Sequence, residues 1–281
     1  MSMMQDMLKP PAGLDFDFTT PPGEPALVPA DGVTWRVFAN PVTMFIGGVA
    51  AVLLEMAEPS VRSGVWDHSS FRTDPGTRLR RTGFTAMITV YGARSRATEV
   101  IAHVVGIHDR VRGTTPDGTP YRANDPRLLD WVQATATFGF TQAYHRFARP
   151  LTPAEQDAAF AEGQVAARLY GATGAPRSRA EWDRLLAETA PRLEPSEILA
   201  EFLAIMNGAP ILPRWARGLQ RLLVRAAVDM VPEPVRSLPQ LRGEGLRFGE
   251  SLVVTALARA AMLAVRADSP VAQSRRRVGE G

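Results

Sequence analysis

The sequence contains no cysteine among its 281 residues. Disulfide bonds, thiolate metal ligands and a cysteine nucleophile are therefore excluded. A metal site in this chain would have to use histidine, carboxylate or neutral oxygen ligands. Histidine is also scarce, and its four positions are His68, His103, His108 and His145. Any metal chemistry consequently depends on very few side chains.

Lysine is nearly absent as well, because Lys9 is the only one and arginine supplies almost all of the positive charge. The formal net charge is only +3, and the basic residues are scattered along the chain. The exception is the run Arg275, Arg276 and Arg277, which we interpret as part of a solvated tail rather than a nucleic-acid-binding arm. No nucleic-acid partner is expected.

The sequence also lacks a long hydrophobic run and a recognisable signal peptide. Its first 30 residues are rich in proline, glycine and aspartate, without an apolar stretch. The longest apolar run, residues 42–54, is about 13 residues long, which is too short to span a bilayer and is typical of a buried helix. We therefore expect a cytoplasmic protein without a membrane span. The sequence does not indicate an oligomeric state.

Alternating strand patterns are weak throughout, and internal repeats and the nucleophile-elbow, phosphate-loop and dinucleotide motifs are missing. What is present is a succession of helical patterns with start and stop signals. We predict an all-α fold, a single compact multi-helix domain over residues 33–268. An extended Pro/Gly-rich segment (residues 1–32) precedes it, and a flexible basic tail (residues 269–281) follows. The predicted helices cover residues 41–57, 59–68, 75–91, 94–112, 126–149, 153–171, 178–190, 195–206, 213–231 and 244–266, with a small hairpin near 116–121.

His108 is the most informative side chain. In the predicted helix over residues 94–112, the apolar residues share one face of the helical wheel: Val100, Ile101, Val104, Val105, Ile107 and Val111. His108 lies near the middle of this face, and Arg112 one turn further on. Burying both is costly unless each is satisfied. A metal bound to the imidazole with an anion at the arginine would satisfy them, and so would a carbonyl and a carboxylate within an ordinary core.

A polar stripe runs along the predicted helix over residues 75–91, formed by Arg78, Arg81, Thr82, Thr85 and Thr89. It is interpretable as a solvated face or as the wall of a cavity that holds a polar ligand. Because the stripe contains three threonines and no acidic residue, the second interpretation, the wall of a cavity, is favoured.

Two acidic residues end the most apolar helix. Glu55 and Glu58 are expected to form salt bridges with arginine or to act as a base near a buried site. His68 is expected to make local hydrogen bonds at a helix end, His103 to flank the His108 face, and His145 to lie at a surface or interface.

Five stretches, taken together and in order, resemble the family of rubber oxygenases (latex-clearing proteins) and mycophenolic-acid-pathway oxygenases. They are residues 48–59, 64–69, 74–82, 107–113 and 121–135, and the similarity extends over roughly residues 35–265. The resemblance implies an α-helical protein with a heme b pocket between helices. It also implies dioxygen as a co-substrate and an apolar, alkene-containing small molecule as the substrate.

By the same resemblance, His108 is the metal ligand, bound to iron, and Arg112 binds a heme propionate. Arg78, Arg81 and Thr82 form the catalytic distal wall, and Arg78 also contacts the cofactor. Arg81 stands where rubber oxygenases carry a lysine that caps the iron. Because arginine has no lone pair to give a metal, we expect the distal side to be open and Arg81 to be a hydrogen-bond donor. Family members often carry Gln and His where Glu55 and Glu58 stand, and His at the position of Gln133.

The resulting hypothesis is a heme-dependent oxygenase that inserts oxygen into, or cleaves, a carbon–carbon double bond. Two alternatives stay open. The chain could bind heme as a sensor without turnover, or it could be a metal-free helical module that binds an apolar small molecule.

Overall fold

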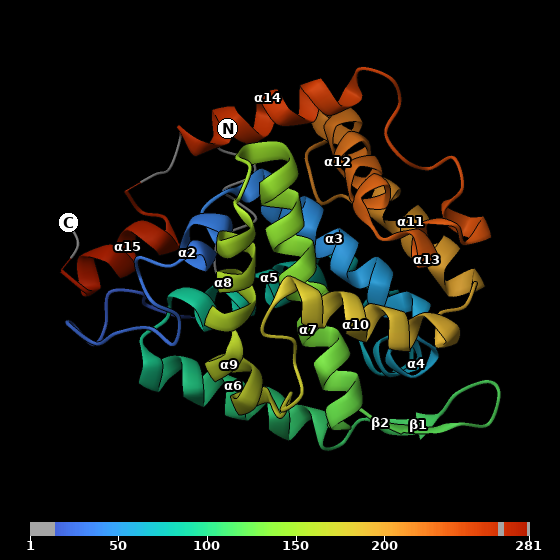
Figure 1. The fold of residues 1–281 in the computed structure, drawn as a ribbon, viewed down its shortest axis with the longest axis horizontal. Coiled ribbons are helices and arrows are strands. Elements are labelled where there is room, and N and C mark those ends of the chain that lie inside the picture. The colour runs from blue at the N-terminus through green and yellow to red at the C-terminus, as the bar shows by residue number, and fades with distance from the viewer. Residues whose placement is uncertain (1–14, 264–266, 280–281) are drawn as a thin grey trace.

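The computed structural model describes residues 15–263 and 267–279, and it confirms an all-α architecture. Helix α3 (Pro41–Ala57) lies in the middle of the molecule (Figure 1). Around it pack α7 (Pro126–Ala143), α11 (Glu197–Gly208), α12 (Arg217–Met230) and α14 (Glu250–Met262). This arrangement explains why α3 carries the longest apolar run of the sequence.

The local sequence around α3 favours a helix at both ends. Asn40 is the N-cap, and its side-chain oxygen accepts hydrogen bonds from the backbone N–H groups of Val42 and Thr43. Glu58 then ends α3 and caps α4 (Pro59–His68), because its Oε2 accepts from Val61 N at 2.8 Å. Both helices begin with proline, as predicted.

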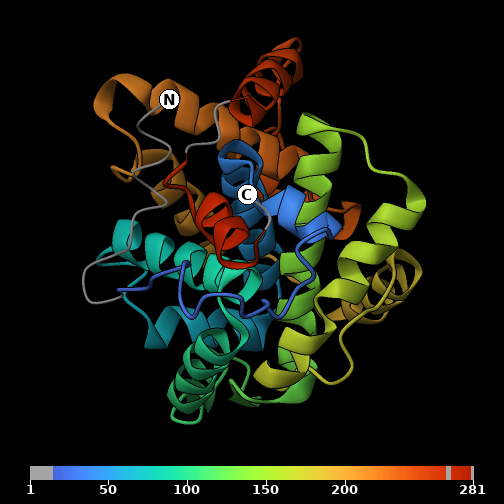
Figure 2. The same cartoon turned by 90° about the vertical axis from the view of Figure 1, so that its left-hand side faces the viewer.

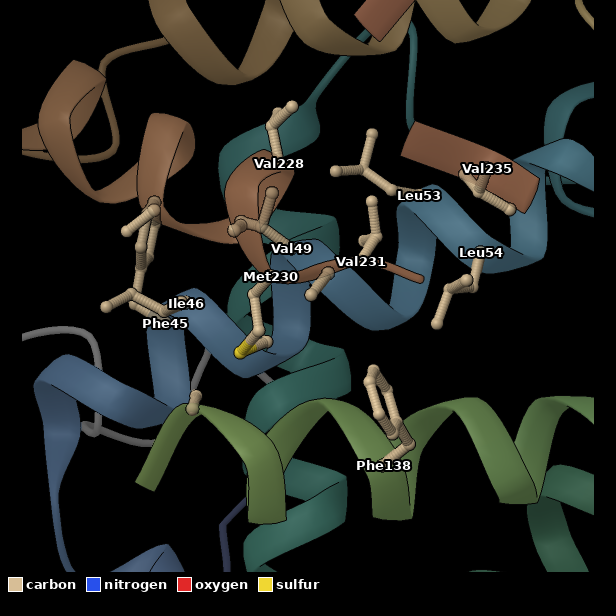
Figure 3. Close-up of a cluster of buried hydrophobic side chains, with 14 of the residues drawn as sticks. Phe45, Ile46, Val49, Leu53, Leu54, Phe138, Val228, Met230, Val231 and Val235 are labelled. Atoms are coloured by element: carbon tan, nitrogen blue, oxygen red, sulfur yellow. The ribbon is translucent and has the colours of Figure 1, made fainter. Parts of the chain in front are cut away.

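The core around α3 consists of aliphatic and aromatic side chains from several helices. Figure 3 shows members of this cluster contributed by α3, by α7 and by the end of α12: Phe45, Ile46, Val49, Leu53, Leu54, Phe138, Val228 and Met230. Helices α3 and α7 cross at two glycines, and a Cβ on Gly139 would lie 2.4 Å from the carbonyl oxygen of Gly47. The closest approach of the two backbones therefore requires residues without side chains.

Further helices surround this centre, and two of them begin with a side-chain cap at the start that the sequence predicts. Thr152 and Glu155 form a capping box at the start of α8. The surrounding helices are α2 (Val33–Phe38), α5 (Pro75–Tyr91), α6 (Arg94–His108), α8 (Pro153–Glu162), α9 (Gln164–Tyr170), α10 (Arg179–Thr189) and α13 (Glu233–Arg236). A π-helical turn, Tyr144–Ala148, extends α7, and short 3-10 turns cover Ala190–Arg192, Arg214–Ala216 and Pro239–Leu241.

Three predicted helix boundaries are wrong. Helix α6 ends at His108, and the predicted continuation to Arg112 is a turn followed by strand β1 (Arg112–Thr114), which pairs antiparallel with β2 (Pro120–Arg122). The helix predicted over residues 153–171 is divided at Gly163 into α8 and α9. The last long helix begins at Glu250 rather than at residue 244, because Gly249 has a positive φ that starts the helix there. Its predicted end at residue 266 lies outside the described residues.

The interpretation of the C-terminal arginine run as part of a solvated tail is only partly correct, because Arg275 and Arg276 are exposed whereas Arg277 is buried. Residues 270–277 form helix α15 (Pro270–Arg277), which packs on α5 (Figure 2). The guanidinium group of Arg277 is buried and donates hydrogen bonds to the carbonyl oxygens of Phe18, Glu24 and Tyr91. Three backbone acceptors that would otherwise lack partners hold this arginine inside, which a charge pattern alone does not reveal.

The predicted N-terminal extended segment is described from residue 15, and residues 15–32 contain no helix. Phe18, Ala26, Leu27 and Val28 are nevertheless buried in a second apolar cluster with Trp35, Phe84 and Ile88.

Among the described residues, no single helix is both long and apolar enough to cross a membrane, although α3 and α4, bent by 110°, pass the length and composition test as a pair.

Candidate functional site

The candidate site is built on α5 and α6, which pack against each other, and on Glu55 of α3, whose carboxyl group interacts electrostatically with Arg78 of α5. Helix α5 begins where predicted, because Asp74 Oδ1 accepts a hydrogen bond from Thr77 N and Pro75 occupies the first turn. The inward face of α6 contains Ala97 and Ile101, both buried. His108, seven residues after Ile101, belongs to the same face by helical periodicity.

His108 is the last residue of α6 and is half-buried. Its Nδ1 atom is buried and has no aligned hydrogen-bond partner. Burial lowers the pKa of the ring, and the positive charge of Arg78 lowers it further; a side-chain hydrogen bond with Asn124 and the charge of Asp109 act in the opposite direction. The net direction is downward, so the imidazole is neutral at pH 7 and has a lone pair to offer.

Arg78 brings a positive charge into the same region. Its Nη1 donates to Thr82 Oγ1 at 2.9 Å, and Thr82 Oγ1 donates to the carbonyl oxygen of Arg78, also at 2.9 Å. Burial lowers the pKa of this guanidinium group and the Glu55 carboxyl group raises it. Arginine nevertheless stays charged. A charged, desolvated group here is suited to bind an anion.

Glu55 lies on the side of α3 that is directed toward this arginine. Burial raises the pKa of Glu55 to about 7, and Arg78 and a hydrogen bond from Thr135 act against that rise. Thr135 Oγ1 is 3.4 Å from Glu55 Oε1. A carboxyl group with this pKa can take up or release a proton near neutral pH.

The half-exposed residues of α3 share one face. Pro41, Gly48, Val52 and Glu55 keep some accessible surface, whereas the rest of this helix is buried. The spacings of seven, four and three residues put them on one line, which ends at Glu55. This line is the part of α3 that keeps accessible surface.

The structure does not place Arg112 with the other predicted residues. It is exposed in β1, opposite Arg122. The expectation that it follows His108 on a buried helical face is wrong, because the helix ends before it. Ile107, assigned to the same apolar face, is 43% exposed and is also misplaced by the wheel.

The three residues that the resemblance assigns to the distal wall differ in exposure. Arg78 is half-buried, whereas Arg81 and Thr82 are exposed on α5. Further along the polar stripe, Thr89 Oγ1 donates to Thr85 O at 3.0 Å and lies 3.1 Å from the hydroxyl of Tyr170 on α9. The stripe is therefore not a uniformly solvated face.

The other histidines have ordinary roles. His68 lies at the end of α4, as expected, but its Nε2 lies 3.1 Å from Tyr121 Oη in β2, so the expectation of local hydrogen bonds is wrong. His103 is exposed on α6, away from the inward face. His145 Nδ1 accepts a hydrogen bond from Leu151 N and so stabilises the chain after the π-helical turn. Glu58 forms the expected salt bridge, with Arg127 at 3.1 Å.

Sequence reasoning missed three residues near the site: Asn124, Thr135 and Tyr170. Asn124 directly precedes Asp125, the N-cap of α7. Its place in the sequence therefore indicates only a role at the start of that helix. Thr135 is fully buried in α7. Its polar role becomes visible only when α3 brings Glu55 beside it.

Comparison with known proteins supplies a family. A family model described as "ER-bound oxygenase mpaB/B'/Rubber oxygenase, catalytic domain" matches residues 35–267. No curated protein and no solved structure matches the chain. Because the family model covers most of the sequence, including every helix of the candidate site, the chain belongs to the mpaB/rubber oxygenase family of oxygenase catalytic domains.

Proposed function

We propose that this oxygenase-family protein depends on heme b and acts on an apolar, alkene-containing small molecule, by oxygen insertion or by oxidative cleavage of the double bond. The observation that carries the proposal is the state of His108. It is a half-buried imidazole whose pKa is lowered and whose Nδ1 is buried. A neutral ring oriented by its second nitrogen is what a histidine ligand of iron requires.

The distribution of possible ligands fits heme better than a bare metal ion. Among the described residues, which include all four histidines, no group of three or more His, Asp or Glu side chains could hold an ion. Heme supplies four nitrogen ligands from its porphyrin and needs only one or two from the protein. A single histidine at the end of α6 is therefore sufficient for heme.

Arg78 is suited to the anionic or polar side of the cofactor. It is charged and desolvated, and its electrostatic influence reaches both Glu55 and His108. It would pair with a propionate or donate hydrogen bonds on the distal side, with Thr82 holding the guanidinium group by the bond at 2.9 Å. Arg81 would contribute a further distal donor. Arg112 would reach a propionate from the exposed hairpin, which is the part of the proposal that rests on the family resemblance alone.

Bound heme supplies the activation of dioxygen. The chain would orient the substrate and handle protons. Gly48 and Val52 on the accessible line of α3 would contact the apolar substrate, and Glu55 at its end would accept or donate a proton, since its pKa is about 7.

The experiment is to express the full chain with a heme supply and to measure its absorption spectrum beside two single variants. We expect a Soret band for the wild type, loss of most of the band in His108→Ala, and no loss in His103→Ala. The second variant is a matched control, because His103 lies on the same helix but is exposed. Full heme occupancy in His108→Ala would contradict the ligand assignment. Oxygen uptake with a panel of alkenes then separates an oxygenase from a heme sensor.

A further inference from the structure

Asn124 lies beside His108, and its side chain is hydrogen-bonded to one residue before and one residue after His108 in the sequence. Its Nδ2 donates to the carbonyl oxygen of Val105 at 3.1 Å and to Asp109 Oδ1 at 2.6 Å. Both partners can only accept hydrogen bonds, so the amide is oriented with its nitrogen toward them. The orientation of the amide oxygen follows, and Oδ1 is left as a free acceptor.

A buried polar atom in each of these two neighbouring side chains has no hydrogen-bond partner. One is Asn124 Oδ1 and the other is His108 Nδ1. Leaving a buried polar atom unpaired is costly, and such atoms are rare in folded proteins. One of the pair is an acceptor and the other can carry a hydrogen, so each supplies what the other lacks. The Asn124 side chain raises the pKa of His108 by hydrogen bonding, which is the effect of an acceptor on an imidazole.

We propose that Asn124 is the positioning residue of His108: its Oδ1 accepts the Nδ1–H bond, fixes the ring as the Nδ1–H tautomer and leaves the Nε2 lone pair for iron. This inference rests on the proposed function for its last step only. The tautomer is a property of the protein itself. A neutral amide acceptor gives the ligand less negative character than a carboxylate would, so it sets the electron donation to the metal as well as the ring orientation.

The first test uses the full chain without heme. The nitrogen-15 chemical shifts of the His108 ring report which nitrogen carries the hydrogen. We expect the Nδ1–H tautomer in the wild type and in Asp109→Ala, which removes one hydrogen bond of the Asn124 amide but keeps its Oδ1. In Asn124→Leu we expect a shift toward the Nε2–H tautomer. An unchanged tautomer in Asn124→Leu, or an Nε2–H ring in the wild type, would overturn the proposal.

The second test measures the iron reduction potential and heme affinity of the heme-loaded protein. Asn124→Leu should raise the potential and weaken heme binding by about tenfold or more. Asn124→Asp combined with Asp109→Asn should lower the potential, because it presents a carboxylate to Nδ1 while relieving repulsion from Asp109. If Asn124 has a merely structural role, the reduction potential should change in the same direction in both variants or in neither of them. Either result would overturn the proposal.

These outcomes keep the inference distinct from the proposed function. If the wild type binds no heme, the proposed function fails, while the tautomer of the heme-free protein still decides the role of Asn124. If Asn124→Leu does not fold, the charge-swapped pair decides it.

Discussion

At the scale of single residues, the ionisation of Glu55 makes the stability of the protein depend on pH. Burial raises its pKa from 4.5 to about 7, which corresponds to roughly 3 kcal/mol. Screening reduces that value, because the side chain keeps some accessible surface. Below pH 4.5 the carboxyl group is protonated in both the folded and the unfolded chain. Between pH 4.5 and about 7 the unfolded chain ionises first, so this group lowers the stability as the pH rises.

Glu55→Gln should remove this pH dependence. Relative to the variant, the wild type should lose stability between about pH 4.5 and pH 7 and show no further relative loss above that range. Denaturant unfolding of both proteins across this range measures the difference. Parallel curves for the two proteins would show that Glu55 titrates normally, and its assignment as a proton carrier would then fail.

The residue scale also shows what the sequence could predict. The inward position of His108 follows from helical periodicity, because the residues that bury α6 repeat at helical spacing. Arg112 could not be placed in the same way, because the wheel assumes that the helix continues. The helix stops where the backbone turns toward the hairpin and Asn124 binds Val105 O, which is a tertiary contact without a local signal.

At the scale of elements, the crossing of α3 and α7 fixes the position of Glu55. A Cβ on Gly139 would lie 2.4 Å from Gly47 O and 3.3 Å from Ala51 N, so the two backbones would have to separate. We expect Gly139→Ala to destabilise the protein by about 2 to 4 kcal/mol.

Gly106→Ala is the matched control for this prediction. Gly106 also lies within a helix, but it is exposed, and a Cβ added there would meet no atom within 4 Å. The control should be neutral or stabilise by up to about 1 kcal/mol, because alanine favours helix more than glycine. Comparable unfolding midpoints for the two variants would contradict the tight crossing.

At this scale, the start of a helix can be predicted from the sequence where an N-cap residue and a proline mark it. Helices that begin with an N-cap and proline, such as α3, α5, α7 and α8, start where the sequence indicates. The start of α14, which has no such signal, is displaced, and only the positive φ of Gly249 marks it, whereas α6 begins at Arg94 as predicted without a side-chain cap. The hairpin, signalled by Pro116 and Gly118, was found because turn residues have local conformational preferences.

At the scale of the whole molecule, Arg277 joins the two ends of the described chain. Its guanidinium group holds Phe18 O and Glu24 O of the N-terminal segment together with Tyr91 O of α5. Arg277→Ala would leave three carbonyl oxygens, two of them buried, without this donor, and we expect a loss of about 3 kcal/mol in the free energy of unfolding or about 5 °C or more in Tm.

The exposed Arg275, two residues earlier in α15, provides the control, since Arg275→Ala should change Tm little. Limited proteolysis of Arg277→Ala should also cut residues 15–32 earlier than in the wild type. Equal Tm values for the two variants would show that the buried arginine does not fasten this segment.

Cavity complementation tests most directly whether His108 is the ligand of heme iron. His108→Gly removes the ring, and added imidazole can take its place if the iron lies next to it. We predict that His108→Gly binds little heme alone and that imidazole restores a Soret band close to that of the wild type. If His108→Gly binds heme fully without imidazole, or if imidazole changes nothing, His108 is not the ligand.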